Sequence, residues 1–381
     1  MTEGQCGRAA DEGVPARRLR HAIVGVGANV FAAHRPALDL PTVEVVGVAD
    51  VNEAIGRERA AEFGCPSFAD HRALLDAMRP DVVVVMTPHP FHARIAIDAL
   101  EAGAHVLCEK AMAVHVGEAD AMIAASQRAG RMLAVNLQFR HRQEVRAAKR
   151  LIDAGRLGQV QRIEVVATWT RSAAYYRAAP WRGTWKGEGG GVLMNQAPHN
   201  LDLLAHLAGM PARLAAWTRT QIHAIEAEDT AHAMLEWTDG ALGYLHASTA
   251  EADAGDRIEI VGTGGRISLA MGTLTGESFA PDIRDHIRES ADAFGTPAVQ
   301  PLSVELADEA GDHASGDHVA VYRDFHAAIL AGAPLMADGA QGRMSLELAN
   351  AMTLSSRTGA IVELPLDRAA YVALLNELRT G

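Results

Sequence analysis

The first half of the chain alternates short apolar runs with longer amphipathic stretches, and this pattern constrains the fold more than any other feature. The runs predict strands at residues 22–26, 43–49, 81–86, 104–108 and 132–135, and the stretches predict helices at 52–63, 71–78, 92–101 and 118–129. Strands that are apolar along their whole length are buried on both faces. The alternation therefore predicts a doubly wound parallel sheet, which binds ligands at the carboxyl ends of its strands.

The second half has a different pattern, and a chain of 381 residues is too long for one ordinary core. We interpret residues 1–17 as a disordered tail, 18–140 as the parallel-sheet domain and 141–381 as a second, α+β domain. Its β-rich runs lie at 160–170, 212–220, 230–237, 241–248, 257–262 and 266–269, and its helices at 143–154, 318–331 and 339–357. The runs predict a large, mainly antiparallel open sheet covered by helices on one face. Residues 276–317 carry little signal and are interpreted as a long loop over the site or at an interface.

Composition narrows the classes of function. A net charge of −12 repels a polyphosphate, so we expect no nucleic-acid partner. No run of 18 apolar residues is present, so we expect no membrane span. The three cysteines are scattered without metal-ligand spacing, which favours a reducing, cytoplasmic compartment and predicts no structural metal.

The first predicted strand runs into Gly25-Val26-Gly27, where the first glycine allows a tight turn and the second lets the backbone approach a pyrophosphate. Val30 stands where the Rossmann fingerprint has a third glycine. Asp50 ends the second strand, and a carboxylate there accepts hydrogen bonds from ribose hydroxyls and repels a 2′-phosphate. These residues favour NAD over NADP. The alternatives are an ordinary strand-to-helix turn and, for Asp50, a helix N-cap.

Lysine is rare in this chain. Only three of its 35 Lys and Arg residues are lysines, namely Lys110, Lys149 and Lys186. Arginine cannot release its proton, whereas the pKa of a lysine can be moved by its surroundings. Lys110 follows the run 104–108, at the carboxyl end of a central strand, so we expect it to face the cofactor crevice. The alternative is a solvated lysine at a strand end.

The segment 175–202 holds the other candidate groups. Three glycines, Gly189 to Gly191, precede Asn195, and Pro198 begins a helix that places His199 and Asp202 one turn apart. Aromatic and cationic side chains suited to a sugar or cyclic polyol are Tyr175, Tyr176, Trp181, Arg182, Trp185 and Lys186. The alternatives are an aromatic subunit contact and a structural histidine.

Taken in this order, the motifs resemble the glucose–fructose oxidoreductase/inositol dehydrogenase (Gfo/Idh/MocA) family over about residues 20–370. The resemblance implies a Rossmann domain joined to an open α/β sheet domain, assembled as a homodimer or homotetramer. It implies a catalytic group at Lys110, Asn195 and His199. This chain has Ala111 where the family usually has proline, and Asn195 where it often has aspartate.

The resemblance also extends to Asn136-x-Gln138-x-Arg140, which is similar to the segment joining the two domains, and to the ending at 362–365. The residues expected at the cofactor are Gly25, Gly27, Ala28, Asn29, Val30, Asp50, Thr87, Pro88, His89, His92, Glu109, Lys110, Asn136 and Gln138. Those expected at the substrate are Lys110, Arg140, Tyr175, Trp181, Arg182, Trp185, Lys186, Asn195 and His199.

This group predicts an NAD-dependent dehydrogenase acting on a secondary alcohol of a cyclic polyol or sugar, of the inositol or hexopyranose type. We expect His199 to accept the hydroxyl proton near its ordinary pKa, Lys110 to stabilise the developing alkoxide, and Asn195 to orient the alcohol. Two alternatives remain. One is glycoside cleavage through transient oxidation by tightly held NAD, and the other is a non-catalytic NAD-binding sensor.

Overall fold

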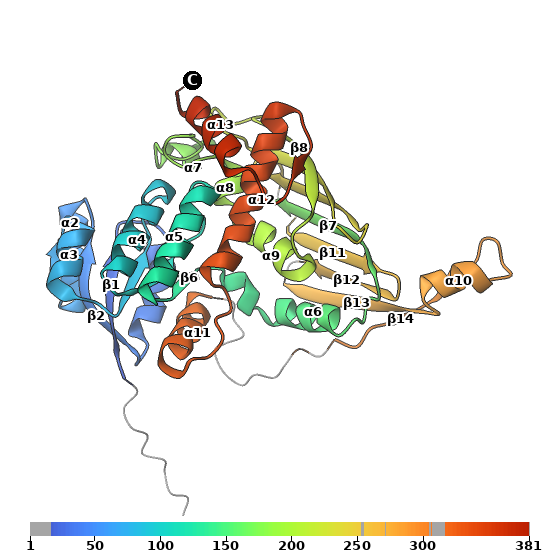
Figure 1. Cartoon of the computed structure of the whole chain (residues 1–381), viewed down its shortest axis with the longest axis horizontal. Coiled ribbons are helices and arrows are strands. Elements are labelled where there is room, and N and C mark those ends of the chain that lie inside the picture. The colour runs from blue at the N-terminus through green and yellow to red at the C-terminus, as the bar shows by residue number, and fades with distance from the viewer. Residues whose placement is uncertain (1–16, 253–254, 271, 305, 307–316, 381) are drawn as a thin grey trace, which may run out of the picture.

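The computed structural model describes residues 17–252, 255–270, 272–304, 306 and 317–380. They form two sheets with helices packed around and between them (Figure 1). Apart from residue 17, the expected N-terminal tail lies outside these residues. Within the described ranges no helix combines the length and the apolar character needed to cross a membrane.

The first sheet is parallel throughout, in the order β3-β2-β1-β4-β5-β6. Its strands are β1 (Leu19–Val24), β2 (Val43–Ala49), β3 (Ser67–Phe68), β4 (Val82–Val85), β5 (His105–Cys108) and β6 (Leu133–Val135). Successive residues of β4 enter different cores: Val83 and Val85 lie in one cluster, and Val82 and Val84 in the other. The expected doubly wound sheet is confirmed, and its strands are apolar throughout because both faces are covered.

The helices of this half are α1 (Phe31–His34), α2 (Glu53–Phe63), α3 (His71–Met78), α4 (His92–Glu101) and α5 (Val116–Ala129). Side-chain caps set some of their starts: Asn52 accepts from two backbone N–H groups of α2, and Asp70 accepts from one of α3. The helix after the Gly25-x-Gly27 turn is only α1, one turn long, followed by the 3₁₀ helix η1 (Arg35–Asp39).

The second sheet has the order β14-β13-β12-β11-β7-β10-β9-β8-β15. Its strands are β7 (Val160–Thr168), β8 (Arg213–Arg219), β9 (Thr230–Glu236), β10 (Leu242–Ser248), β11 (Arg257–Gly262), β12 (Gly265–Ala270), β13 (Thr273–Ala280), β14 (Ala298–Pro301) and β15 (Val362–Glu363). Among the described strands of this second sheet, only β7 and β10 pair in parallel, so the expectation of a mainly antiparallel sheet is confirmed. Its remaining helices are α6 (Gln143–Asp153), α7 (Ala173–Arg177), α8 (Val192–Asn195), α9 (Pro198–Ala208), α10 (Ile283–Glu289), α11 (His318–Ala331), α12 (Gly339–Thr358) and α13 (Arg368–Thr380).

The segment 276–317 was interpreted as a long loop over the site or at an interface, and the loop interpretation is wrong for its described part. β13 and β14 extend the sheet, with α10 between them in the chain. Figure 1 shows this part at the outer end of the second sheet, far from the parallel sheet. It therefore does not cover a site between the two halves.

Helix α11 returns to the first half. Its residues Val321, Tyr322 and Phe325 are buried in the cluster that covers one face of the parallel sheet. Helix α12 packs against α5, α9 and β8, between the two sheets. The parallel sheet is therefore completed by a helix that follows the second sheet in sequence, because one face of the sheet would otherwise stay apolar and exposed. The division at residue 140 stays a prediction.

Two buried histidines join α11 to β1. The Nε2 atoms of His21 and His326 are 3.0 Å apart, Nδ1 of His21 contacts the carbonyl of Leu19, and Nδ1 of His326 contacts the hydroxyl of Thr42. Neutral rings satisfy every position of this chain of hydrogen bonds, whereas a second ring proton on His21 would put its Nε2–H against the Nε2–H of His326. Burial lowers the pKa of His21 to about 4 and that of His326 to about 3.

We expect acid to destabilise the fold through this pair. The unfolded chain binds protons at an ordinary histidine pKa, so stability is intact above that value and falls with pH down to the lowered pKa. Each histidine should contribute a slope of about 1.4 kcal/mol per pH unit in the free energy of unfolding. Urea unfolding between about pH 7.5 and pH 5 measures it, and His326→Gln should reduce the slope by that amount. An unchanged slope in the variant would contradict this account.

Candidate functional site

A long groove of about 900 Å³ runs along the carboxyl ends of the parallel strands. It extends from Asp50, after β2, to Lys110, after β5, and is closed on the other side by residues of the segment that follows α7, including Trp181 and Arg182. Of the expected cofactor residues, those that line it are Gly25, Gly27, Ala28, Asn29, Val30, Asp50, Thr87, Pro88, His89, His92, Glu109 and Lys110. The groove is therefore built from the strand ends that the sequence predicted.

The turn after β1 shows why the sequence has glycine there. Gly25 has φ +92°, and a Cβ at this position would lie 2.8 Å from the backbone N of Thr87 at the end of β4. Gly27 donates its backbone N–H to Oδ2 of Asp50 at 2.7 Å, and Oδ1 of Asp50 accepts from Asn52 N at 2.8 Å. Asp50 thus holds the Gly25–Gly27 turn against the end of β2, besides lining the groove.

A small cavity of about 230 Å³ adjoins the groove and brings together the expected catalytic group, Lys110, Asn195 and His199. Lys110 and Asn195 line both spaces, and Lys110 Nζ donates to the backbone carbonyl of Asn195 at 2.8 Å. The short helix α8 carries Asn195, and α9 presents His199 from its first turn. A Cβ on Gly191 would lie 1.9 Å from the carbonyl O of Glu228, so only glycine permits α8 to start there.

His199 is almost entirely buried and stacks on Phe139, with ring centroids 4.3 Å apart. Neither ring nitrogen forms a hydrogen bond within the described part of the chain, and Nδ1 is fully buried. Burial first, and then the positive charge of Lys110, lower the pKa of His199 to about 3. The expectation that it titrates near its ordinary pKa is therefore wrong: the lowered pKa keeps the imidazole neutral well into the acid range and makes it a weaker base than an ordinary histidine.

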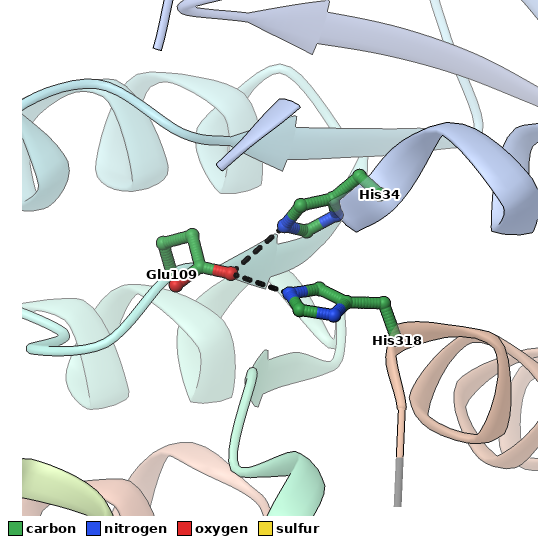
Figure 2. A group of neighbouring side chains, drawn as sticks. All are labelled: His34, Glu109 and His318. Atoms are coloured by element: carbon green, nitrogen blue, oxygen red, sulfur yellow. Dashed lines mark hydrogen bonds and ion pairs between the residues drawn. The ribbon is translucent and has the colours of Figure 1, made fainter. Parts of the chain in front are cut away.

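Glu109, next to Lys110, is the centre of a buried polar cluster (Figure 2). Its Oε1 lies 2.8 Å from His34 Nε2 and 3.6 Å from His318 Nε2, and it accepts a short hydrogen bond from Asn136 Nδ2. Two histidines and a carboxylate are also a metal-binding set of donors. Two ligands of one tetrahedral zinc ion lie about 3.3 Å apart, given metal–ligand bonds near 2.0 Å, so the 2.8 Å contact fits a direct hydrogen bond.

The contacts around Glu109 hold its pKa well below the ordinary value despite its burial. His34 belongs to α1 and His318 begins α11, so one carboxylate joins the helix after the glycine turn, the strand end that carries Lys110 and the returning helix. Backbone N–H of Lys110 also donates to Glu109 Oε2 at 3.1 Å. Glu109 thereby fixes the strand end from which Lys110 projects.

Of the remaining expected residues, some line one of the two cavities and the others lie outside both. Tyr175 lines the small cavity, Trp181 and Arg182 line the groove, and Tyr176 bonds to Thr249. Trp185 is buried away from both, and Lys186 is exposed. Asn136 donates a side-chain hydrogen bond to Glu109, and Gln138 lines neither cavity. His92, although it lines the groove, directs both ring nitrogens at the carbonyls of Thr87 and Ala111.

Arg140 has a structural role. It and Asp202 are each about 1% exposed, and the guanidinium binds both carboxylate oxygens, at 2.9 and 2.6 Å. Its remaining nitrogen donates to the carbonyl of Met336 and to Gln341, each at 3.0 Å. The expected contact with substrate is therefore not available to Arg140, which instead ties the chain before α6 to α9 and α12.

Sequence reasoning missed part of the small cavity. The residues that line it and were not expected are Phe139, Trp169, Arg171, Gln196, Asn200 and Asp256. Trp169 and Arg171 follow β7, and a strand end beside a predicted site is a signal that was available. Asp256 directly precedes β11, more than fifty residues away from any motif, and nothing in the local sequence indicates it.

Two family models match the chain. Residues 19–137 match the oxidoreductase family with an NAD-binding Rossmann fold, and residues 145–268 match the GFO/IDH/MocA C-terminal domain. The chain belongs to the Gfo/Idh/MocA family. It is thus an oxidoreductase, with NAD as its cofactor. Thr87 Oγ1, buried in the groove wall without a hydrogen-bond partner in the described residues, fits a polar ligand there.

Named members of the Gfo/Idh/MocA family are similar at about 30% identity. A protein of Amycolatopsis mediterranei, named for the oxidoreductase subunit of UDP-kanosamine synthase, is 31% identical over 66% of this chain and 75% of its own. The D-glucoside 3-dehydrogenase of Escherichia coli is 31% identical over 51% and 55%. The crystal structure of the WlbA dehydrogenase of Bordetella pertussis, in complex with NADH and UDP-GlcNAcA, has a TM-score of 0.78 at 29% identity, covering 92% of this chain and all of that one.

Proposed function

We propose that this enzyme transfers a hydride from a secondary alcohol of a cyclic sugar or polyol to NAD. The observation that carries the proposal is the meeting of Lys110, Asn195 and His199 around one small cavity, which adjoins the long groove at Lys110 and Asn195. A cavity of about 230 Å³ suits a single ring. A sugar as substrate is supported by the relatives named for a glucoside and for UDP-kanosamine, and by the similar structure in complex with UDP-GlcNAcA.

In this mechanism the substrate hydroxyl lies between Lys110 and His199. The neutral imidazole accepts the hydroxyl proton. Lys110 donates a hydrogen bond to the same oxygen and stabilises the negative charge that develops on it. Bound NAD supplies the electrophilic carbon that accepts the hydride. The surrounding aromatic side chains, Phe139, Trp169 and Tyr175, exclude water from the reacting groups and offer apolar faces to a sugar ring.

Asp50 is proposed to bind the adenosine ribose hydroxyls and so to select NAD over NADP. Asp50→Ser removes this acceptor and also releases the Gly27 N–H that the carboxylate holds at 2.7 Å. We expect the Kd for NADH to rise about tenfold to a hundredfold, and the preference for NAD to fall, since two charge-assisted hydrogen bonds are lost. Fluorescence titration with NADH and NADPH measures both. Asp76→Ser, an exposed change on α3, is the matched control, and unchanged affinities for Asp50→Ser would contradict the assignment.

The assembly is proposed to be a homodimer or homotetramer formed through the second sheet. Its face opposite the helices exposes Trp217 on β8, Met234 on β9 and Leu242 on β10, each about half accessible. Their strand registers put them on one side: Met234 pairs with Ala215 and with Tyr244, which share a face with Trp217 and Leu242. Exposed apolar residues gathered on one sheet face favour contact with a second copy.

The proposed reaction is tested with a panel of myo-inositol, methyl α-D-glucopyranoside, levoglucosan and UDP-N-acetylglucosaminuronic acid, each with NAD and with NADP. The absorbance of NADH follows the reaction. We expect NADH to accumulate with at least one sugar and NAD. Cleavage of a glycoside without net NADH would instead indicate transient oxidation, and NAD binding without turnover on any member of a broad panel would indicate a sensor.

A further inference from the structure

Glu188 lies next to the site, and its buried carboxylate has no role in the proposed mechanism. It directly precedes the three glycines and is 1% exposed. Its Oε2 accepts from the backbone N–H of Gly183 at 2.6 Å, and its Oε1 accepts a short hydrogen bond from the side-chain Nδ2 of Asn195. Burial raises the pKa of Glu188 to about 7, while the bonds from Gly183 and Asn195 oppose that rise.

This contact decides which way the amide of Asn195 faces. When Glu188 is ionised its carboxylate only accepts hydrogen bonds, so the NH₂ end of Asn195 then faces Glu188 and the Oδ1 end faces away. No described side chain or backbone group donates to Oδ1, and Asn195 lines both the groove and the small cavity. The oxygen is therefore available to a ligand hydroxyl, as one oxygen of a carboxylate would be.

We propose that Glu188 is a positioning residue that holds Asn195 with its amide oxygen turned towards the substrate hydroxyl. The inference rests on the proposed function, because it assumes that Asn195 contacts the substrate. It explains how an uncharged amide at position 195 still offers an acceptor beside Lys110. It also gives a role to the 2.6 Å bond from Gly183, which fixes the other oxygen of Glu188 and so prevents the carboxylate from rotating away.

The proposal predicts a specific failure for Glu188→Gln. The N–H of Gly183 still requires an acceptor, so the new amide oxygen stays there and the new NH₂ group faces Asn195. Asn195 must then rotate its amide, offering Oδ1 to Gln and its NH₂ group to the substrate. A donor replaces an acceptor at the substrate hydroxyl, and we expect kcat/KM to fall about thirtyfold, as for one misplaced hydrogen bond. The Kd for NADH should not change.

The same argument predicts rescue. In Glu188→Gln/Asn195→Asp, the new amide at 188 donates to one carboxylate oxygen at 195, and the other oxygen accepts from the substrate whichever way the group turns. We expect the double variant to recover to within about fivefold of wild-type kcat/KM, since both hydrogen bonds are restored. A merely structural role of Glu188 predicts no such recovery. Glu226→Gln, on an exposed residue of the neighbouring loop, is the matched control.

The assay uses the panel sugar with the highest kcat/KM, with NAD, and thermal melting checks that each variant folds. Near-wild-type activity of Glu188→Gln, or a double variant as impaired as that single variant, would overturn the inference. If Glu188→Gln does not fold, the pH profile of Asn195→Asp is compared with that of the double variant. In Asn195→Asp the carboxyl groups at 188 and 195 touch and share one proton, so the activity of this variant should fall as the pH rises, whereas that of the double variant should not. Parallel pH profiles of the two variants would overturn the inference. Full turnover by Lys110→Ala would instead refute the proposed function, which separates the two failures.

Discussion

Replacing Lys110 with alanine should reduce kcat by a factor of about 10³ or more, because the substrate oxygen loses the cationic hydrogen-bond donor that the proposed mechanism places against it in the small cavity. The Kd for NADH should change little, since the groove keeps its other lining residues. Steady-state kinetics on the best panel sugar, together with NADH titration, measures the two effects separately. We expect the fall in kcat to be far larger than any change in the Kd for NADH.

Lys110→Arg should fail almost as completely, although arginine serves nearly everywhere else in this chain as the cation. Burial lowers the pKa of Lys110, and Nζ reaches the carbonyl of Asn195 at 2.8 Å. A planar guanidinium is larger and places its donors elsewhere. Lys149→Ala and Lys149→Arg are the matched controls, because Lys149 lies on the surface of α6 in an ion pair with Asp153. Wild-type turnover by either Lys110 variant would refute the assignment.

Arg140→Met should reduce the free energy of unfolding by about 3–5 kcal/mol, because Asp202 would stay buried without its counter-charge. The carboxylate of Asp202 is fully buried, and burial already raises its pKa despite the guanidinium. Activity should fall as well, since Asp202 lies one turn from His199 on α9. Urea unfolding at neutral pH measures the loss of stability.

The double variant Arg140→Met/Asp202→Leu should recover most of that stability, since two apolar side chains replace the pair without leaving a charge. This pattern distinguishes the structural role of Arg140 from the substrate contact that the sequence suggested. If Arg140→Met raised KM while leaving the unfolding curve unchanged, the substrate contact would be the better explanation.

The parallel sheet and the site at its edge could be predicted because they depend on local patterns. The run 43–49 and the helices 71–78, 92–101 and 318–331 were predicted with the bounds that the structure has. The predicted strand ends, the glycines of the Gly25–Gly27 turn and the rare Lys110 then indicated one side of the candidate site. A motif of three glycines followed by Asn195 and His199 located the other side, because only glycine fits against the Glu228 backbone.

What the sequence did not predict depends on contacts between distant residues. His21 and His326 are 305 residues apart, so nothing local indicated that α11 covers the first sheet. Arg140 in its motif looks the same whether it binds a substrate or Asp202, and only burial distinguishes the two. The pKa of His199 was likewise misjudged, since it depends first on burial in the folded chain and then on Lys110, which is 89 positions earlier in the chain.

The most direct test of the central claim follows the transferred hydrogen. The enzyme is incubated with NAD and the best panel sugar carrying deuterium on its ring carbons, and the nicotinamide product is analysed by mass spectrometry. Hydride transfer from a secondary alcohol predicts NADH that carries one deuterium, in an amount equal to the ketosugar formed, and neither product with Lys110→Ala. Ketosugar formed without deuterium in the nicotinamide ring would contradict the account.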